Sequence, residues 1–444
     1  MNATLTLQPH HTQQLPHTRH MYSACLVGLC IAGPAHADAV VDWNIAYDQA
    51  SPAVGGPPQR AYLGAMVHIA IHDALNSIDR RHETYNVVAP ASSHASADAA
   101  IATAAHDVLI NQLSRAPDSP AKLAARLDVE TRYATSLAAI PNGSAESSGI
   151  AAGQAAAAAI IAKRTGDGFA TPNLPYTLAP GLGVHQPTPP ALAPPAFAGW
   201  ASLAPFAMTS PSQFRSGPSP VFNLNGLVYT LNYLEVKYLG SASVRAAAPD
   251  SDRSRIARFW PGGGANGNAV TRIVLADRPL DPWQSARLFA LINIANVDAS
   301  ISVFDTKYAY NFWRPVTAIR WANDGNPFTQ PDPAWLSYQP TPPYPDYTCG
   351  LTTTTGSTYA VLRRFFGTDM LPYTLTVSIP QPAPLLPETM TRNYDTLSEA
   401  SVESVDARVF GGMHFRQGCA QGLRQGDKVG GFAFTHYLKP LRRR

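Results

Sequence analysis

The sequence of 444 residues contains little charge: only 14% of its side chains are charged. Its 33 basic and 30 acidic residues leave a formal net charge of +3. Nucleic-acid binding needs a strongly basic surface, so this balance predicts no nucleic-acid partner. Internal repeats and a regular strand–helix–strand alternation are also lacking, which argues against solenoids and doubly wound sheets. The 45% of hydrophobic residues is typical of a globular protein with a sizeable core.

Long hydrophobic runs are scarce, and the most apolar stretch outside the expected core helices lies near the N-terminus. Arg19 precedes the apolar segment 22–33, which is too short to span a bilayer. The run Ala35-His36-Ala37 then supplies a small-x-small cleavage site before Asp38. We therefore predict a signal peptide at residues 1–37 and export of the protein to the periplasm or the medium.

The leader has one open alternative, because Met21 could be the true start. No other segment is long and apolar enough for a membrane, so we expect no integral membrane segment in the mature chain. The mature chain, residues 38–444, is expected to form a single domain.

Cysteine is rare, with four residues in the whole chain. Cys25 and Cys30 would leave with the signal peptide, so that only Cys349 and Cys419 remain. An even pair in an oxidising compartment favours a disulfide between Cys349 and Cys419. Two buried free thiols are the alternative that the spacing leaves open.

Helical periodicity dominates the rest of the chain and predicts an all-α, multi-helix bundle. The expected helices lie at 57–81, 95–114, 120–140, 145–164, 222–240, 250–259, 281–313, 352–366, 388–409 and 417–437. Forty prolines indicate long ordered loops, and the largest Pro-rich loop covers 172–220. Its scattered aromatic side chains predict that it packs over the helices. The catalytic-like core should lie at about 281–437.

Two cations stand in the run Lys307-Tyr-Ala-Tyr-Asn-Phe-Trp-Arg314-Pro315. Seven residues is nearly two helical turns, so both side chains should project from one helical face. Pro315 disfavours helical geometry at Arg314 and should end the helix there. The pair could hold an oxyanion, although cations also favour helix C-termini through the macrodipole.

A second element is the run Thr348-Cys349-Gly350-Leu351, at the end of another Pro-rich loop. A helix should begin here, and its first N–H groups lack partners within the helix. A glycine at such a position lets an anion come close. An ordinary Thr-capped helix is the alternative.

The third element is Arg408-Val-Phe-Gly411-Gly412-Met-His414. Arg408 should lie in the last turn of a helix that the two glycines end, which leaves His414 on an exposed turn. A histidine nitrogen beside an arginine suits capture of a phosphate-like centre.

Together these elements resemble the vanadium-dependent haloperoxidases and the related type 2 phosphatidic acid phosphatases. The family signature is Lys-x6-Arg-Pro, then Pro-Ser-Gly-His, then Ser-Arg-x5-His. The first block is present in full, and the third is present at Arg408 and His414, with Ala407 in place of the serine. Two further runs, Trp283-Gln-Ser-Ala-Arg-Leu-Phe-Ala-Leu-Ile-Asn-Ile-Ala and His68-Ile-Ala-Ile-His-Asp-Ala-Leu-Asn76, also resemble stretches typical of bacterial haloperoxidase-like members.

The resemblance implies a role for each matching residue. The oxygens of vanadate, or of phosphate in its place, would be bound by Lys307, Arg314, Cys349, Gly350 and Arg408. His414 would be the catalytic residue, as the axial ligand of vanadium in a haloperoxidase or as the nucleophile in a phosphatase. The implied small-molecule substrates are hydrogen peroxide and a halide, or a phosphomonoester. Homo-oligomers are frequent in the family, so one is possible by analogy.

The second block departs from the family pattern. Cys349 replaces a hydroxyl donor with a weaker thiol donor. Leu351 replaces the histidine that would act as general acid–base, a role worth about 10²–10⁴-fold in rate. Asp346, Tyr347 or His185 could substitute for that histidine. Three hypotheses therefore stay open: a haloperoxidase, an acid phosphatase, and an oxyanion-binding homologue without catalysis.

His68 and His72 stand four residues apart on one predicted helix and could bind a metal. Ile69 stands where a zinc peptidase has its glutamate, and no third ligand is evident. We therefore expect both histidines to have a structural role.

Overall fold

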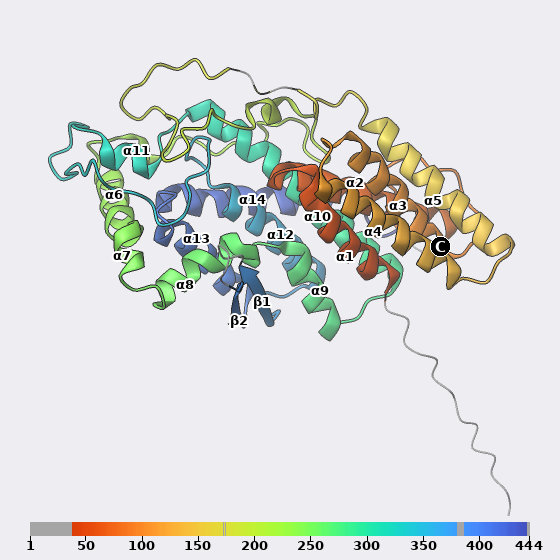
Figure 1. Ribbon diagram of the computed structural model, residues 1–444. Helices are drawn as coiled ribbons and strands as arrows, with labels where there is room; N and C mark the ends of the chain where they lie inside the picture. Colours follow the sequence, from red (N-terminus) through yellow and green to blue (C-terminus); the bar gives the residue numbers. More distant parts are fainter. Residues whose placement is uncertain (1–37, 172, 174, 380–385, 442–444) are drawn as a thin grey trace, which may run out of the picture. The chain divides into compact units, whose positions relative to one another are not determined.

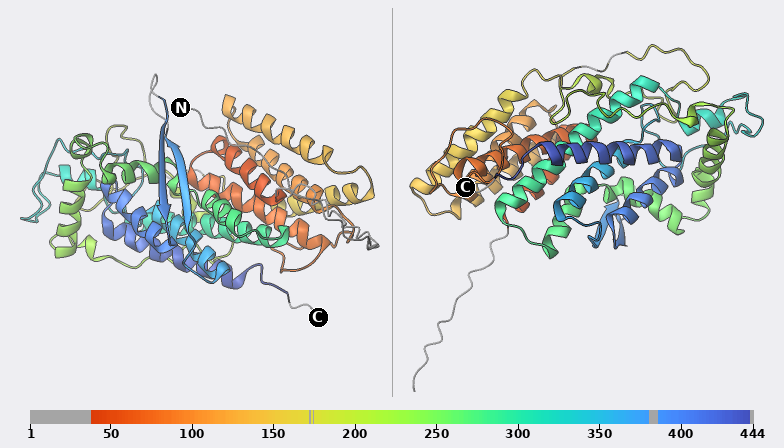
Figure 2. Two further views of the ribbon diagram at one scale, coloured as in Figure 1. Left: turned by 90° about the horizontal axis from the view of Figure 1, so that it is seen from below. Right: turned by 180° about the vertical axis from the view of Figure 1, so that it is seen from behind.

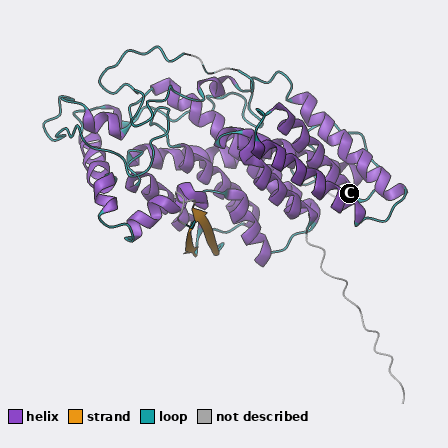
Figure 3. Cartoon of the chain, in the orientation of Figure 1, coloured by secondary structure: helices purple, strands orange, loops and turns teal. Residues whose placement is uncertain are grey.

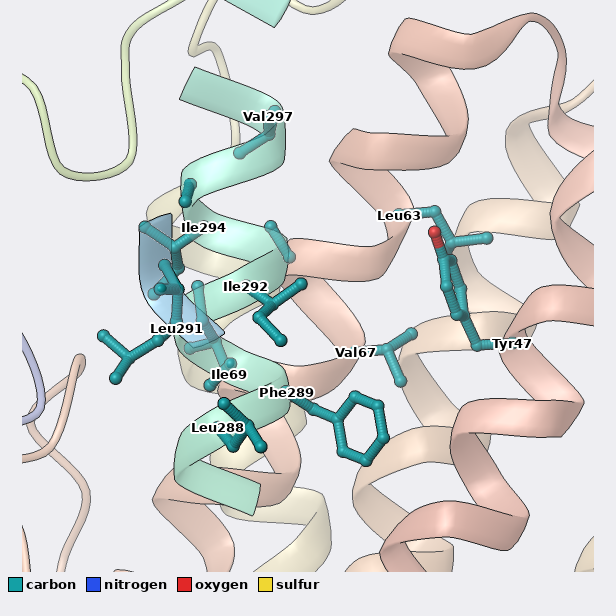
Figure 4. Packing of buried hydrophobic residues seen from close by; sticks show 14 of the residues in the cluster. Tyr47, Leu63, Val67, Ile69, Leu288, Phe289, Leu291, Ile292, Ile294 and Val297 are labelled. Carbon is teal, nitrogen blue, oxygen red and sulfur yellow. The ribbon is translucent and has the colours of Figure 1, made fainter. Parts of the chain in front are cut away.

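Helix α10 (Pro282–Tyr310) is the central helix of the chain, and its ends are fixed by local sequence. Asp281 and Gln284 form a reciprocal capping box at its start, with Pro282 in the first turn. The helix ends at Asn311, which has a left-handed backbone (φ 52°). Its side chains are buried almost all round, and Figure 4 shows Leu288, Ile292 and their neighbours facing the residues of α2. A helix that is apolar on every face belongs in the middle of a bundle.

The computed structural model describes residues 38–171, 173, 175–379 and 386–441 (Figure 1). The predicted signal peptide, with Cys25 and Cys30, lies outside these residues. Around α10 stand α1 (Ala39–Ala50), α2 (Pro57–Ile78), α3 (Ala97–Arg115), α4 (Pro120–Ala138), α5 (Ser144–Lys163), α6 (Leu227–Leu239), α7 (Ala242–Ala246), α8 (Asp252–Phe259), α9 (Gly267–Asp277), α11 (Pro315–Arg320), α12 (Gly350–Phe366), α13 (Leu397–Phe410) and α14 (Arg416–His436). Short turns of 3-10 type lie at Ser51–Val54, Ala198–Ser202 and Pro220–Phe222, and one π-type turn at Trp260–Gly264.

Figure 3 shows how far helices predominate in the described part of the chain, and the all-α prediction is confirmed. Helices α2, α3 and α5 pack against one another, and α12 packs along α14. Helix α10 contacts α2 on one side and α12 and α14 on the other, so it joins the two groups. The residues that carry the three sequence motifs all lie at or near the ends of α10, α12, α13 and α14.

Glycines let α14 lie close against α12. A Cβ atom at Gly422 would stand 2.8 Å from the carbonyl oxygen of Cys349, and one at Gly426 would overlap the carbonyl oxygen of Thr353. No side chain larger than hydrogen fits at either position without moving a backbone. This close approach sets the distance between the N-terminal ends of α12 and α14.

The prediction of a helix over 388–409 is wrong in its first part. Glu388–Tyr394 is strand β2, which pairs antiparallel with β1 (Tyr373–Ile379), and α13 begins only at Leu397 (Figure 2). In β1 alternate side chains are buried, and Met390 of β2 pairs with Val377. The Thr-rich, alternating pattern of both segments fits a half-buried hairpin better than a helix.

The Pro-rich loop packs over the helices, as its aromatic residues indicated. Its backbone N–H groups at Phe206, Ala207 and Met208 donate to the Asp298 carboxylate at 2.7–2.8 Å. Asp298 lies within α10 and is fully buried, and this burial raises its pKa to about 6. Three backbone donors on one buried carboxylate attach the loop to the central helix.

Helix α10 is also long and apolar enough to cross a membrane, with a mean hydropathy of 1.4 over its most apolar 18 residues. The expectation that no mature segment meets this criterion is therefore wrong as stated. Of that stretch 94% is buried inside the molecule, as in the core helix of a bundle. Its apolar character is accounted for by the packing around it.

Candidate oxyanion site

The first motif brings Lys307 into the interior of the molecule. Lys307 lies in the last turn of α10 with no exposed surface. Its Nζ donates to the carbonyl oxygens of Pro345 at 2.7 Å and Asp346 at 3.0 Å. Burial, and then the neighbouring charge of Arg314, hold the pKa of Lys307 well below its usual value. Burying a charged ammonium group costs free energy of desolvation. Such a group is expected where a protein binds an anion.

Arg314 is fully buried as well, but not on the same helical face as Lys307. The helix ends at Tyr310, and Arg314 is extended (φ −85°, ψ 156°) just before α11. The prediction of a shared helical face is therefore wrong, because Asn311 turns the chain four residues earlier than Pro315. The two side chains still converge, since each cation lies 5.1 Å from the ring of Tyr344.

Arg314 connects the first motif to the other two. Its Nε donates to the Tyr344 carbonyl at 2.7 Å, and its Nη1 donates to the Met413 carbonyl at 2.9 Å. Nη1 also lies 2.9 Å from Nε2 of His414. Its Nη2 is buried and has no hydrogen-bond partner within the described residues. One donor of the guanidinium is therefore free for another acceptor.

His414 is buried, with 1% of its surface exposed, although the sequence predicted an exposed turn. The chain reverses at Gly411 and Gly412, where Gly412 has φ 76°, and this turn directs His414 inward. Oδ1 of Asp346 lies 2.8 Å from Nδ1 of His414, at an ion-pair distance but without hydrogen-bond alignment. With Arg314 donating to Nε2, the carboxylate favours the tautomer that carries its proton on Nδ1.

Arg408 lies in the last turn of α13, as predicted, and is 6% exposed. Its Nε is buried without a hydrogen-bond partner in the described chain. Its charge acts on Arg314, Tyr344 and Cys349, which places it at the same site. Three buried cations therefore face a site with one buried carboxylate, that of Asp346.

The second motif supplies the start of a helix. Helix α12 begins at Gly350, and its N-cap residue Cys349 makes no side-chain capping hydrogen bond. The alternative of a Thr-capped helix is therefore excluded. A Cβ atom at Gly350 would meet no atom within 4 Å, so the space beside this helix start is open. An uncapped helix N-terminus next to open space attracts an anion.

Cys349 and Cys419 are both free and fully buried, in place of the predicted disulfide. Burial by itself raises the pKa of Cys349. Hydrogen bonding from Cys419, interaction with the ring of His414 and the charge of Arg408 outweigh this effect, so that the pKa of Cys349 falls well below its usual value. The pKa of Cys419 is raised by burial and by its bond to Cys349.

Leu351 belongs to an apolar cluster at the position where a histidine was expected. Its half-buried side chain packs with Cys349, Val405, Cys419 and Leu423. At this position the family pattern has a histidine that can transfer a proton. Here Leu351 only packs against apolar side chains.

Asp346, Tyr347 and His185 were named as possible substitutes for that histidine, and they differ in whether their side chains already have partners. Tyr347 donates its hydroxyl to the Gly217 carbonyl at 3.0 Å, and Asp346 faces His414. Both ring nitrogens of His185 are buried and have no hydrogen-bond partner among the residues that the structure describes. Burial, and then the charges of Arg314 and Lys307, lower the pKa of His185 to about 3.

The backbone places His185 beside the first motif. Its N–H donates to the Asn311 carbonyl at 2.8 Å, and Trp313 N donates to the Gly183 carbonyl at 2.9 Å. Val184 and Phe312 form an antiparallel bridge between these two segments. A histidine of the Pro-rich loop is therefore held against the segment that leads to Arg314.

The sequence did not reveal the contacts of Asp346 or Tyr344, because both depend on the folding of the Pro-rich segment onto α10. His68 and His72, by contrast, have structural partners. His68 lies 2.7 Å from the Gly64 carbonyl and 2.9 Å from Nδ2 of Asn44, and His72 lies 3.1 Å from Asp73. Among the described residues, the one group that could hold a metal by its spacing is Cys349, His414 and Cys419.

Comparison with known proteins connects this geometry to a family. Residues 287–443 match the sequence model of a family described as the VCPO second helical-bundle domain. The vanadium chloroperoxidase of Curvularia inaequalis is 28% identical over 181 residues, which cover 32% of this chain and 29% of that protein. The match thus spans less than a third of that relative's length.

Solved structures extend the likeness to most of the chain. The first bacterial vanadium-dependent iodoperoxidase aligns with a TM-score of 0.71 at 21% identity, over 90% of this chain and 96% of that one. The holo-type bacterial vanadium-dependent chloroperoxidase aligns with a TM-score of 0.68 at 18% identity, over 86% and 93% of the two chains. At these identities the likeness shows a common fold.

Proposed function

Because residues 287–443 match the VCPO second helical-bundle domain and the fold is that of bacterial vanadium-dependent haloperoxidases, we propose that this chain binds vanadate, or phosphate in its place, at the oxyanion site described above. The proposed ligands of the vanadate or phosphate oxygens are Lys307, Arg314, Cys349, Gly350 and Arg408, and His414 would be the axial ligand. The name "oxyanion site" is used below for these six residues.

One observation carries the proposal: two buried guanidinium nitrogens, Nη2 of Arg314 and Nε of Arg408, have no partner among the described residues. A buried donor without an acceptor costs about 1–3 kcal/mol, and more when it is charged. An oxyanion would accept from both. Each charge contact at about 4 Å contributes roughly 4 kcal/mol at an effective dielectric near 20, before desolvation.

The remaining residues also fit an oxyanion. The N–H groups at the uncapped start of α12 and the open space at Gly350 suit a tetrahedral or trigonal group of oxygens. Lys307 already holds the carbonyls of Pro345 and Asp346, so it can fix the shape of the loop that leads to Gly350.

His414 is positioned for its role by two neighbours. The carboxylate of Asp346, 2.8 Å from Nδ1, orients the ring. Arg314 covers Nε2 at 2.9 Å, and would have to transfer this donor to an oxygen of the anion when Nε2 becomes a ligand. Vanadate, when bound, would supply activation of hydrogen peroxide toward a halide.

We further propose that His185 takes the acid–base role that Leu351 cannot fill. Its ring nitrogens are unpartnered, and its low pKa results from burial and from the charges of Arg314 and Lys307. An oxyanion of charge −2 or −3 would offset those charges and raise the pKa of His185, which would let the ring accept a proton.

Two alternatives share the same residues. A phosphatase would use Nε2 of His414 as the nucleophile toward a phosphomonoester, with Asp346 behind the ring. A binding protein without turnover is favoured by the apolar packing of Leu351.

The test compares the purified wild type with His414→Ala, His185→Gln, Leu351→His and the control His94→Gln, whose side chain is exposed. Vanadate and phosphate affinities are measured by equilibrium dialysis. Bromide oxidation with peroxide and hydrolysis of an aryl phosphate measure turnover. We expect vanadate binding that His414→Ala weakens, and bromide oxidation that His185→Gln lowers by about 10²-fold or more while vanadate binding persists.

Other outcomes separate the hypotheses. Binding without turnover in the wild type, together with turnover in Leu351→His, would establish the binding protein. Aryl phosphate hydrolysis without bromide oxidation would establish the phosphatase. Absence of binding, or binding that His414→Ala leaves untouched, would refute the site.

A further inference from the structure

Two thiols that the proposed function does not need as a pair lie together beside the oxyanion site. The sulfur atoms of Cys349 and Cys419 and a ring nitrogen of His414 all lie within 4.8 Å of one another. Both cysteines are fully buried and unbridged.

The backbone holds the two cysteines together. Cys349 N donates to the Gly418 carbonyl at 3.1 Å, and the Thr352 hydroxyl donates to the Cys419 carbonyl at 2.9 Å. Gly422 lets α14 approach the Cys349 carbonyl closely. A disulfide of about 2.05 Å then requires the two sulfur atoms to move together over a short distance, without separating α12 from α14.

A metal ion is a weaker explanation of the same cluster. Two cysteines and a histidine are a known ligand set for zinc. Here, however, Arg314 lies 2.9 Å from the same histidine, and Cys349 interacts electrostatically with Arg408 and with Lys307. A divalent cation among three buried cations is electrostatically disfavoured.

We propose that Cys349 and Cys419 form a peroxide-oxidisable dithiol, with Cys349 as the reacting thiol and Cys419 as the resolving thiol. Cys349 is assigned as the reacting thiol because it directly precedes Gly350, where a Cβ atom would meet no atom within 4 Å. Cys419 is the second thiol of the same buried apolar cluster, which contains Val405 and has Leu351 and Leu423 packed against it.

The chemistry balances with hydrogen peroxide as the oxidant. The deprotonated sulfur of Cys349 attacks one peroxide oxygen, the O–O bond breaks, and the departing hydroxide takes up the thiol proton as water. The sulfur of Cys419 then attacks the sulfenic acid sulfur, the S–O bond breaks, and a second water leaves. Peroxide is reduced to two waters while two thiols become one disulfide, and an external dithiol can reverse the change.

The test starts from fully reduced wild-type protein, to which one equivalent of hydrogen peroxide is added. We expect the loss of two titratable thiols, the loss of two hydrogen atoms from the intact mass, and a Cys349–Cys419 cross-link in the non-reducing peptide map. In Cys419→Ala, the reaction should stop at a sulfenic acid on Cys349 that dimedone traps. Cys349→Ser, which restores the hydroxyl of the family pattern, should leave Cys419 unmodified.

Three outcomes would overturn the proposal. They are thiols that stay reduced under peroxide, a dimedone adduct on Cys419 in Cys349→Ser, and stoichiometric zinc in the purified protein that Cys419→Ala removes. Thermal unfolding of each variant checks that it folds. Phosphate binding, measured separately by calorimetry, keeps this result distinct from the proposed function, because the dithiol reaction requires no bound oxyanion.

Discussion

Oδ1 of Asp346 and Nδ1 of His414 lie 2.8 Å apart, and both side chains are buried. They are 68 residues apart in sequence: Asp346 precedes the second motif, and His414 ends the third. Asp346 is also 3.7 Å from Arg314, so this carboxylate lies next to both His414 and a buried cation. It is the one buried carboxylate that the described residues bring to the oxyanion site.

Replacement of Asp346 by asparagine should weaken vanadate binding by about 10–100-fold, because the ring of His414 loses the partner that orients it. Equilibrium dialysis against vanadate measures the change. Asp118→Asn, at a fully exposed side chain, is the matched control and should leave the affinity unaltered. An Asp346→Asn protein that binds as the wild type does would contradict the orienting role.

Replacement of Arg408 by methionine should weaken vanadate binding without lowering the free energy of unfolding. The side chain has no hydrogen bond within the described residues, so its loss should leave the free energy of unfolding unchanged or slightly higher. Vanadate affinity should fall by about 10-fold or more, since a charge-assisted hydrogen bond contributes about 1.5–3 kcal/mol. Urea unfolding measures the stability, and equilibrium dialysis measures the vanadate affinity. A large loss of stability would show that Arg408 has a structural partner instead.

Two glycine-to-alanine substitutions should affect different properties: one the stability of the protein, the other its binding of an oxyanion. Gly426→Ala would press a methyl group onto the Thr353 carbonyl and should lower the free energy of unfolding by about 1–3 kcal/mol. Gly350→Ala meets no atom within 4 Å, so it should leave stability intact but narrow the space for an oxyanion. Urea unfolding of both variants, with phosphate titration of Gly350→Ala, decides whether each glycine is needed for packing or for binding.

His185 should make the protein less stable as the pH falls. Its folded pKa is lowered to about 3, whereas a histidine in the unfolded chain titrates near 6.5. Between these values the unfolded state binds the additional proton, so this contribution is fully present above pH 6.5 and decreases toward pH 3. The stability difference between wild type and His185→Gln should change by up to about 1.4 kcal/mol per pH unit in that window. A pH-independent difference would show that His185 takes up a proton in the folded protein.

Much of the helical architecture could be predicted from local pattern. The helices predicted from the apolar periodicity of 57–81 and 281–313 correspond to α2 and α10 within a few residues. The strand pair was missed because its strands are short and Thr-rich, and their pairing joins residues 373–379 to residues 388–394. Periodicity over so few residues does not distinguish a strand from the start of the following helix.

The sequence predicted which residues belong to the candidate site, but not how their side chains are arranged. The motifs pointed to Lys307, Arg314, Arg408 and His414 as one group, and the structure brings them together. The shared helical face was wrong because Asn311 ends α10 before Arg314. The exposed position of His414 was wrong because Arg314 and Asp346, distant in sequence, enclose the ring.

The sequence by itself determined the chemical composition of the site: three cations, a histidine, a helix start at a glycine, and Leu351 where an acid–base group was expected. These are properties of side chains and of local backbone preference, which act over a few residues. The tertiary structure decided that Asp346 lies next to His414, that Cys349 lies beside Cys419, and that the ring nitrogens of His185 are buried with no partner in the described part of the chain. Distance, burial and charge state depend on segments as far apart in the chain as 185, 346 and 414, and only the packing of α10, α12, α13 and α14 brings them together.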